Sequence, residues 1–488
     1  MTGVYILLVI AIYFVLLLSI SYFVGKKHSN NDAFFLGNRE SPWYIVAIGM
    51  IGTSISGVTF VSVPGMVGSF DMTYMQMVLG FIPGYIVVAY VLLPLYYKLR
   101  ITTIYTYLDQ RFGKYSYKTG ASFFILSRIV GSASKLYLVV MILHTLVFRQ
   151  WNIPFYATVS MIILFIWLYT FRSGIKAILW TDALQTICII AAAILIIYQV
   201  ASNLGYSISD TMQAVTSSEH ARVFVFDDWT SKQNFFKQFF GGMLIVIVMT
   251  GLDQDMMQMN LTCRNLKDAQ KNMVSYGIAF VPLNYIMLAL GILMLIFVGQ
   301  NGIPLPQNSD EILPVLATEY LGLPVLICFA VGIVAASFSN ADSALTALTT
   351  TVCIDILNIE KKDKKTAYKI RHIVHLGVCI SFLCFIFLLD SIKQTNILDT
   401  IYKAASYTYG PLLGLFAFGL FTKRIIRDKF SPIICLAAPL FCYTLELTLK
   451  QVFGYSVGYE ILLLNGTITV AGLWIISIGK GEQRLIRE

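Results

Sequence analysis

The stretch AIGMIGTSISGVTFVSVPG, residues 47–65, interrupts an apolar segment with glycine and hydroxyl residues at what would be mid-membrane depth. A second stretch, VIVMTGLDQDMMQ at residues 246–258, is interrupted by Gly251, Asp253 and Asp255. Main-chain polar groups at membrane depth must be satisfied internally unless they line a cavity. These two breaks therefore decide how the rest of the chain is interpreted.

The composition is that of an integral membrane protein. The chain has 488 residues, of which 57% are hydrophobic and only 12% are charged, whereas a soluble domain carries roughly 25% charged residues. So few charges cannot cover a globular surface, and lipid must cover much of it. No linker or low-complexity tract divides the chain, so we predict a single integral membrane domain over residues 1–488.

Apolar runs of membrane-spanning length predict an all-α polytopic fold with about thirteen transmembrane helices. The predicted spans are 3–24, 43–68, 72–97, 117–147, 153–171, 177–203, 234–258, 272–299, 322–356, 367–391, 396–421, 431–453 and 458–479. One set of alternate loops carries 26 of the 35 Lys and Arg residues, and the other set carries six. This asymmetry predicts an N-terminus outside and a C-terminus in the cytoplasm. It also explains the net charge of +9 without a nucleic-acid partner.

The two breaks lie five spans apart, in the second and seventh spans. Because five is odd, the two halves have opposite topology, which predicts inverted five-helix repeats at 43–203 and 234–422. Residues 1–24 then form an extra N-terminal helix, and residues 431–479 form two peripheral C-terminal helices. The alternative is kinking for helix packing, where Gly and Ser are common. Two breaks in matching positions favour a binding site.

Charged residues deep in predicted spans cost roughly 2.5–3.5 kcal/mol each, so each needs a partner or a function. The clearest carboxylates are Asp182 and Asp342, for which an ion pathway is the default interpretation. The clearest cations are Arg128 and Lys135, which lie seven residues apart on one helix face. Buried structural salt bridges are the alternative for these groups.

The ninth span combines small residues with side-chain oxygens over residues 335–350. Four of its residues share one helical face: Ala336, Ser339, Asn340 and Ser343. Sodium, like other hard cations, takes oxygen ligands, and carbonyls freed at the first break near Gly52 and Ile55 are candidates for the remainder. A small-residue packing surface is the alternative. Asp342 favours the ion site, because packing needs no charge.

Enzymatic chemistry is not indicated. The eight cysteines show no Cys-x-x-Cys spacing, and the five histidines form no metal-ligand or catalytic cluster. No clustered His/Glu metal motif is present. We therefore expect no structural zinc and no enzyme.

Six motifs in order resemble the solute:sodium symporters, a family with the LeuT-like inverted-repeat fold. They are DAFFLGNRESPWYIVAIGMIGTSISGVTF, RITTIYTYLDQRFGK, GIKAILWTDALQT, QDMMQMNLTCRNLKDAQK, AASFSNADSALTALTTTVCIDI and YTYGPLLGLF. The resemblance covers nearly the whole chain. It implies a multi-pass protein of the cell (cytoplasmic or inner) membrane, related to bacterial symporters of sialic acids, sugars, vitamins or anions.

The resemblance also implies where sodium binds. The family's conserved site matches main-chain oxygens of Gly52 and Ile55 on the first core helix. On the eighth core helix it matches Ala336, Ser339 and Asn340, where Asn340 departs from the usual Ser or Thr. A second site found in some relatives matches Asp182, Asp342 and Ser343. The carboxylate at position 342 either strengthens that site or neutralises Lys135.

The implied solute pocket lies beside the first break. Its matching positions are Ser54, Ser56, Thr59, Tyr74 and Gln254, together with the cations Arg128 and Lys135. The sialic acid type reads its carboxylate with an Arg whose position falls here near Gly131, about one turn from Arg128 and from Lys135. Sugar-carrying relatives have a Glu-Gln pair where this chain has Val58 and Thr59, which weakens a glucose or galactose assignment.

We therefore expect sodium-coupled symport of a small organic solute into the cytoplasm by alternating access. The cations Arg128 and Lys135 favour an anionic solute, such as a sialic acid or a monocarboxylate. The alternatives are a proton-coupled or uncoupled carrier on the same fold, for which Asp182 and Asp342 are proton acceptors, and a sodium/sugar symporter. A membrane solute receptor is remote, since only GKGEQRLIRE follows the last predicted span. The expected partners are the solute, Na⁺ and the lipid bilayer, without nucleic acid or an obligate protein partner.

Overall fold

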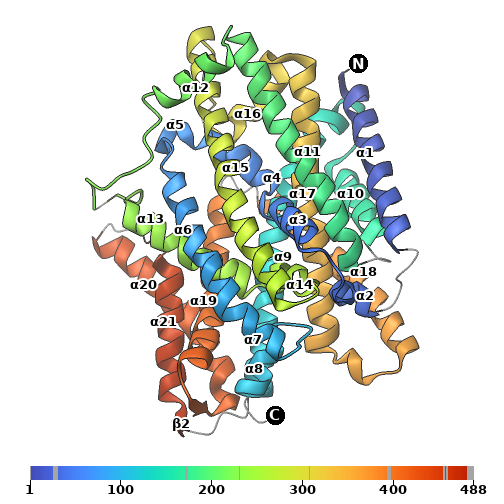
Figure 1. Cartoon of the computed structure of the whole chain (residues 1–488), viewed down its shortest axis with the longest axis vertical. Coiled ribbons are helices and arrows are strands. Elements are labelled where there is room, and N and C mark those ends of the chain that lie inside the picture. The colour runs from blue at the N-terminus through green and yellow to red at the C-terminus, as the bar shows by residue number, and fades with distance from the viewer. Residues whose placement is uncertain are drawn as a thin grey trace.

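The computed structural model describes residues 2–25, 31–170, 174–229, 231–306, 308–392, 397–453, 457 and 460–480. Within these ranges the molecule is a bundle of helices, seen side-on in Figure 1. Its described strands, β1 (Arg424–Ile426) and β2 (Ser477–Lys480), form one antiparallel pair near the C-terminus.

The first break separates two helices, α3 (Trp43–Ser54) and α4 (Gly57–Gly65), whose axes differ by 62°. Ile55 leaves the helical conformation with ψ of 88°. Ser56 then starts the next helix, because its hydroxyl accepts a hydrogen bond from the Thr59 amide at 3.3 Å. Serine is a preferred residue at a helix start, so the local sequence both ends α3 and begins α4.

The second break has a similar angle and a different cap. Helix α13 (Phe235–Val246) continues through η5 (Ile247–Gly251) and meets α14 (Gln254–Leu261) at 64°. Asp253 precedes α14, and its carboxylate accepts a hydrogen bond from the Asp255 amide at 2.9 Å. Aspartate is likewise a preferred N-cap.

Long helices follow each broken pair. After α4 come α6 (Tyr74–Val87), which continues through η2 (Val88–Leu92) into α7 (Leu93–Lys98), then α9 (Lys114–Leu143), α10 (Phe155–Thr170) and α11 (Gly174–Asn203). After α14 come α15 (Leu266–Asn301), α17 (Gly322–Thr351) with η8 (Val352–Ile356), α18 (Lys364–Ile392) and α19 (Ile397–Phe421). Both halves thus place four long segments after a broken one.

The remaining long helices lie at the edges of the bundle. In Figure 1, α1 (Thr2–Gly25) is at one side, and α20 (Ser431–Phe453) and α21 (Glu460–Ile475) are at the other. Short helices connect the long ones: α2 (Asn31–Leu36), η1 (Gly37–Arg39), α5 (Val67–Phe70), α8 (Thr106–Arg111), η3 (His144–Phe148), η4 (Arg149–Trp151), α12 (Ile208–Thr216), η6 (Ser309–Glu311), α16 (Ile312–Val315), η7 (Leu316–Tyr320), η9 (Ile359–Lys361) and η10 (Asp428–Phe430).

The predicted membrane-spanning character is confirmed, and some span edges were wrong. Among the described residues, nine helices are long and apolar enough to cross a membrane, and the two broken pairs pass the same test. Two shorter apolar helices, Phe155–Thr170 and Ile461–Ile475, coincide with the other predicted spans. The helix expected at 272–299 instead begins at Leu266, because Asn265 caps it by accepting the Asp268 amide at 2.9 Å. The exact number of crossings and the orientation of the termini stay predictions.

Helix α17 lies in the centre of the bundle. Every residue from Gly332 to Thr351 is buried, although the segment is rich in hydroxyl groups. It packs against α11, α9 and both broken helices. A buried helix with this much oxygen must satisfy those groups internally or offer them to a ligand.

Two adjacent glycines of α13 differ sharply in their surroundings. A Cβ added at Gly242 would overlap the main-chain carbonyl of Met77 on α6, whereas a Cβ at Gly241 would meet no heavy atom within 4 Å. Gly242 therefore permits close approach of α6 and α13, and Gly241 does not serve that purpose.

We predict that Gly242→Ala destabilises the protein by about 1–3 kcal/mol through overpacking. The matched control, Gly241→Ala, is expected to be neutral or stabilising by up to about 1 kcal/mol, because alanine favours the helix. Thermal unfolding of both variants in detergent measures the difference. Equal midpoints for the two variants would contradict the close packing of α6 against α13.

Candidate sodium and solute site

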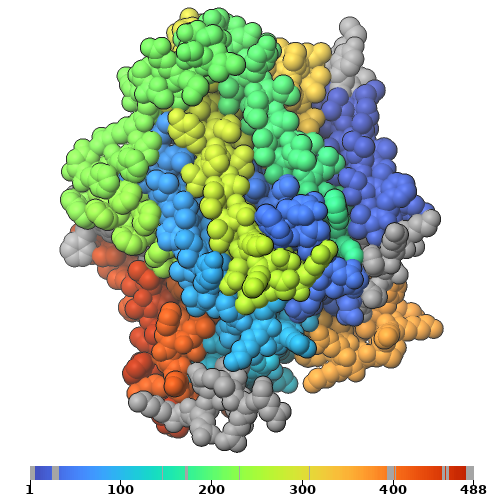
Figure 2. Space-filling view, in the orientation of Figure 1, coloured from blue at the N-terminus to red at the C-terminus, as the bar shows by residue number. Residues whose placement is uncertain are grey.

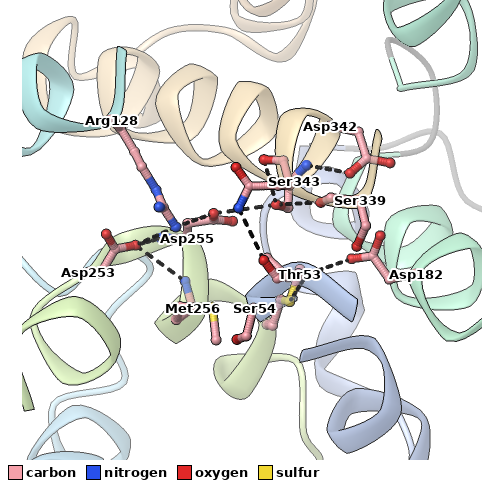
Figure 3. Close-up of polar contacts among 12 residues, drawn as sticks. Thr53, Ser54, Arg128, Asp182, Asp253, Asp255, Met256, Ser339, Asp342 and Ser343 are labelled. Carbon is pink, nitrogen blue, oxygen red and sulfur yellow. Dashed lines mark hydrogen bonds and ion pairs between the residues drawn. The ribbon is translucent and has the colours of Figure 1, made fainter. Parts of the chain in front are cut away.

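The first break faces α11 and α17 at very short range (Figure 3). A Cβ added at Gly52 would clash with the Thr186 hydroxyl, and it would lie 3.0 Å from the Asp182 carbonyl and 3.3 Å from the Ser339 hydroxyl. Glycine at position 52 thus lets the end of α3 touch both neighbours. The main chain of the break and the oxygen-rich face of α17 are in direct proximity.

Main-chain oxygens at this break lack internal partners. The Ser56 amide donates to the Ser54 carbonyl at 3.1 Å, and the Thr59 amide donates to the Ser56 hydroxyl. Within the described chain, the carbonyls of Gly52 and Ile55 accept no hydrogen bond from a main-chain or side-chain donor. These oxygens are available to a ligand at the point where the helix stops.

Side-chain oxygens beside the break are also unpartnered. The Ser339 hydroxyl, the Asn340 amide oxygen and one Asp182 carboxylate oxygen are buried and have no hydrogen-bond partner within the described ranges. Asn340 donates its amide group to the Thr53 carbonyl at 3.1 Å, which directs its oxygen away from that contact. Orphaned buried oxygens are costly, and oxygen is the donor type that sodium takes. The donor set therefore fits Na⁺.

Two further carboxylates border this cluster from α11 and α17. Asp182 accepts a hydrogen bond from the Thr53 hydroxyl at 2.9 Å. Asp342 accepts hydrogen bonds from the Tyr169 hydroxyl at 2.8 Å and from the Ser343 amide at 2.6 Å. Both carboxylates are fully buried. Neither forms an ion pair in the part of the chain that is described, so of the two alternatives for Asp342 the neutralisation of Lys135 is not found.

Arg128 belongs to the second break. Its guanidinium forms ion pairs with Asp253, at 3.2 Å, and with Asp255. The Tyr409 hydroxyl donates to the other oxygen of Asp253. The structural salt-bridge alternative therefore holds for Arg128, and Figure 3 shows it pointing at the two carboxylates. The sequence pattern indicated Asp253 and Asp255 only as an interruption of the span, although two acids in an apolar stretch signal a buried cation.

Ser343 connects the two breaks. Its hydroxyl lies 3.3 Å from an Asp255 carboxylate oxygen and 2.9 Å from the Ser339 carbonyl. The residue predicted as a sodium ligand is thus the point where α17 touches α14. Sequence periodicity placed it on the correct face and gave no indication of this partner.

The expected solute residues are not all together. Ser54 hydrogen-bonds Tyr276, whose hydroxyl also accepts from Tyr85 at 2.9 Å. Ser56 and Thr59 hydrogen-bond each other at 3.1 Å at the start of α4. These contacts leave one side of the break lined by hydroxyl groups.

Gln254 and Lys135, both expected at the solute pocket, differ in whether the protein already uses their polar atoms. Both ends of the Gln254 amide bind main chain: its oxygen accepts from Ile104 at 2.9 Å and its nitrogen donates to Thr102 at 3.3 Å. Its polar atoms are therefore already used, which does not support the predicted place of Gln254 in the solute pocket. The Lys135 ammonium makes no hydrogen bond or ion pair within the described residues and stays partly accessible. Tyr74 is half-buried at the start of α6.

Comparison with known proteins identifies the family and the fold. The family model of the sodium:solute symporter family matches residues 34–428. The sodium/sialic acid symporter SiaT of Proteus mirabilis is 24% identical over 84% of each chain. The human sodium/iodide cotransporter is 22% identical over 81% of this chain and 62% of its own. A solved structure of a Na⁺-coupled sialic acid symporter, in a substrate-bound outward-open state, superposes with a TM-score of 0.82, at 20% identity and over 97% of both chains.

The fold and the matches define a class: a multi-pass membrane transporter with the LeuT-like arrangement of helices, and not an enzyme. The chain belongs to the sodium:solute symporter family. It is a secondary transporter that uses Na⁺ as the coupling ion for a small solute.

We predict that Arg128→Met lowers the free energy of unfolding by about 3–5 kcal/mol, because it leaves two buried carboxylates without a counter-charge. Lys135→Met on the same helix removes no ion pair, so it is expected to lower the free energy of unfolding by clearly less. Adding Asp255→Asn to Arg128→Met should recover part of the stability. Thermal unfolding of the four proteins tests this, and an Arg128→Met variant as stable as Lys135→Met would contradict it.

Proposed function

We propose that this chain takes up a small anionic organic solute together with Na⁺, by alternating access across the cytoplasmic membrane. The observation that carries the proposal is the pairing of free main-chain oxygens at the α3–α4 break with unpartnered buried oxygens of α17. Burying these oxygens without a partner costs free energy. A dehydrated Na⁺ bound among them offsets that cost.

The primary sodium site comprises the main-chain oxygens of the break and three positions on α17. The proposed ligands are the carbonyls of Gly52, Ile55 and Ala336, the Ser339 hydroxyl and the Asn340 amide oxygen. The close approach at Gly52 supports this set. An amide oxygen in place of the family's usual hydroxyl is still a hard, neutral oxygen donor.

The charge balance around the two breaks supports a second cation. Four carboxylates are fully buried here: Asp182, Asp253, Asp255 and Asp342. The basic groups nearby are Arg128, which pairs with two of them, and Lys135. With all six groups ionised, the cluster carries two net negative charges in a low-dielectric interior, where uncompensated charge is costly.

We therefore propose two cations per cycle. The first is Na⁺ at the break, and the second binds at Asp182, Asp342 and Ser343. The second cation is either Na⁺ or a proton. The proton-coupled alternative applies at this second position, because a proton neutralises a buried carboxylate that has no fixed counter-charge among the described residues.

Lys135 is the proposed determinant for an anionic solute. Arg128 is neutralised by two carboxylates, whereas Lys135 keeps an uncommitted ammonium. A Cβ added at Gly57 would clash with Val139, which lies one turn after Lys135 on α9. This close approach shows that α9 lies beside the first break. Relatives whose names specify sialic acid, iodide or monocarboxylates carry anions. Ser54, Ser56, Thr59 and Tyr74 are proposed to bind the remainder of the solute.

The cycle then follows from the two breaks. Residues 43–203 and 234–422 act as the two repeats, and the helices at 1–24 and 431–479 stay peripheral. Inward movement of a cation down the membrane potential supplies about 2.3 kcal/mol per charge per 100 mV. Two cations with one monovalent anion move one net charge inward.

On the predicted cytoplasmic side, residues 101–105 close the route. Gln254 holds the main chain of this segment to α14, and Tyr105 donates to the Leu252 carbonyl at 3.2 Å. Thr103 donates to Asp355 of η8, the segment that directly follows α17, and Asp355 also accepts from Tyr117 at 2.8 Å. These bonds join the second broken helix to α17 and α9, and we propose that they separate when the site opens inward.

We predict that Ser339→Ala and Asp182→Asn each raise the sodium concentration for half-maximal uptake by roughly tenfold, the loss of about 1.4 kcal/mol of ion binding. Ser381→Ala serves as the control, because its exposed hydroxyl bonds only its own helix. Uptake into proteoliposomes under imposed sodium or pH gradients gives the readout. Unchanged sodium dependence in both site variants would refute the assignment.

We further predict that carboxylate solutes, tested as a sialic acid and a short monocarboxylate, raise the thermal unfolding midpoint only when Na⁺ is present. Galactose should not. Lys135→Gln should remove the effect, while Lys232→Gln, an exposed lysine outside the site, should keep it. Stabilisation by galactose and not by either acid would favour the sodium/sugar alternative.

A further inference from the structure

A cavity of about 520 Å³ lies at the far end of α3 from the break. Three separate segments form its walls: the residues that lead into α3, the first turns of α11 and the α14–α15 connection. The lining residues include Glu40, Ile45, Lys176, Leu179, Trp180 and Arg264. Its volume falls within the range of roughly 300–1,000 Å³ that is typical of ligand pockets. In Figure 2 these segments meet on the visible face, blue beside green and yellow-green.

The charged groups of this cavity favour an anion. Lys176 lies 3.0 Å from a Glu40 carboxylate oxygen, and Arg264 donates to the Glu40 carbonyl at 3.4 Å. Two cations face one carboxylate, so the cavity has a net positive charge. Each cation has further N–H donors beyond these contacts, and the guanidinium fork of arginine matches phosphate geometry.

The apolar groups favour a lipid over a free ion. Ile45 and Leu179 form an apolar part of the cavity wall. Trp180, which also lines the cavity, is 43% exposed. Tryptophan next to lysine and arginine is typical of the membrane–water interface. The three segments belong to loops on the predicted cytoplasmic side, where anionic lipid is concentrated and basic pockets between helices bind headgroups.

We infer that this cavity binds the phosphodiester headgroup of a membrane phospholipid. The phosphate lies between Lys176 and Arg264, and an acyl chain follows Trp180 along the outside of α3 and α11. The inference does not rest on the proposed solute or ion sites, because lipid binding is measurable without transport.

The bound lipid joins parts of both halves. The Ser41 amide donates to the Thr262 carbonyl at 3.0 Å, which ties the start of α3 to the α14–α15 connection. A phosphate bridging Lys176 of α11 and Arg264 reinforces that tie. Lipid occupancy therefore holds the cytoplasmic end of α3 in place.

Native mass spectrometry of the full-length protein, equilibrated with phosphatidylglycerol in mixed micelles, tests the site. The double variant Lys176→Gln/Arg264→Gln should retain this lipid about tenfold less than the wild type, as expected for the loss of charge-assisted hydrogen bonds. Lys267→Gln/Lys271→Gln removes two exposed charges from the adjacent start of α15 and should retain it like the wild type. Ile45→Phe, which narrows the cavity without changing charge, should also reduce retention.

Thermal unfolding with Na⁺ verifies that each variant is folded before its lipid is counted. Equal retention by the wild type and the Lys176/Arg264 variant overturns the proposal. A loss of equal size in the Lys267/Lys271 control also overturns it, because that result means general surface attraction. Inorganic phosphate in the millimolar range should not displace the lipid. Displacement by phosphate would make this a site for a soluble anion and overturn the lipid assignment.

Discussion

Hydrogen bonding of the main chain inside lipid is the constraint on which this structure depends. A helix satisfies its own amides and carbonyls, so any interruption at membrane depth exposes groups that hydrocarbon cannot bind. The chain resolves two interruptions by different means. At the first, Ser56 caps the new helix while the carbonyls of Gly52 and Ile55 stay free. At the second, the cap is itself a charged group, Asp253.

The two breaks also differ in how their buried carboxylates are neutralised. At the second break the carboxylates of Asp253 and Asp255 are neutralised by Arg128, a permanent part of the protein. At the first break Asp182 and Asp342 have hydroxyl and amide donors and no fixed cation among the described residues. A protein that binds and releases a cation needs the arrangement found at the first break, since a resident arginine would compete with the ion. Ser343 joins the two regions through a single hydroxyl.

Much of the fold could be predicted from local pattern. Apolar length located the spans, and glycine beside hydroxyl or acidic residues located both breaks, because these signals lie within a few residues of the feature they cause. The start of α15 at Leu266 was missed, since a polar but well-capped first turn looks like a loop when hydropathy alone is considered. The peripheral position of α1 and α20 follows from the repeat spacing.

Pairing across the bundle could not be predicted in this way. Arg128 and its acids are more than a hundred residues apart, and periodicity gives the face of a helix without naming the neighbour. For the same reason Gln254 was assigned to a pocket although main chain from residues 102–104 already uses its amide. Motif alignment placed Ser339 and Asn340 beside the break, and it could not reveal that their oxygens are unpartnered.

Asp253 performs three tasks with one side chain: it caps α14, balances a guanidinium and accepts the Tyr409 phenol. Asparagine retains the cap and loses the charge, while glutamate retains the charge on a stem too long for the cap. Neither substitution preserves all three contacts of Asp253. Any single substitution of Asp253 therefore disturbs the start of α14, the ion pair with α9 or the contact with α19.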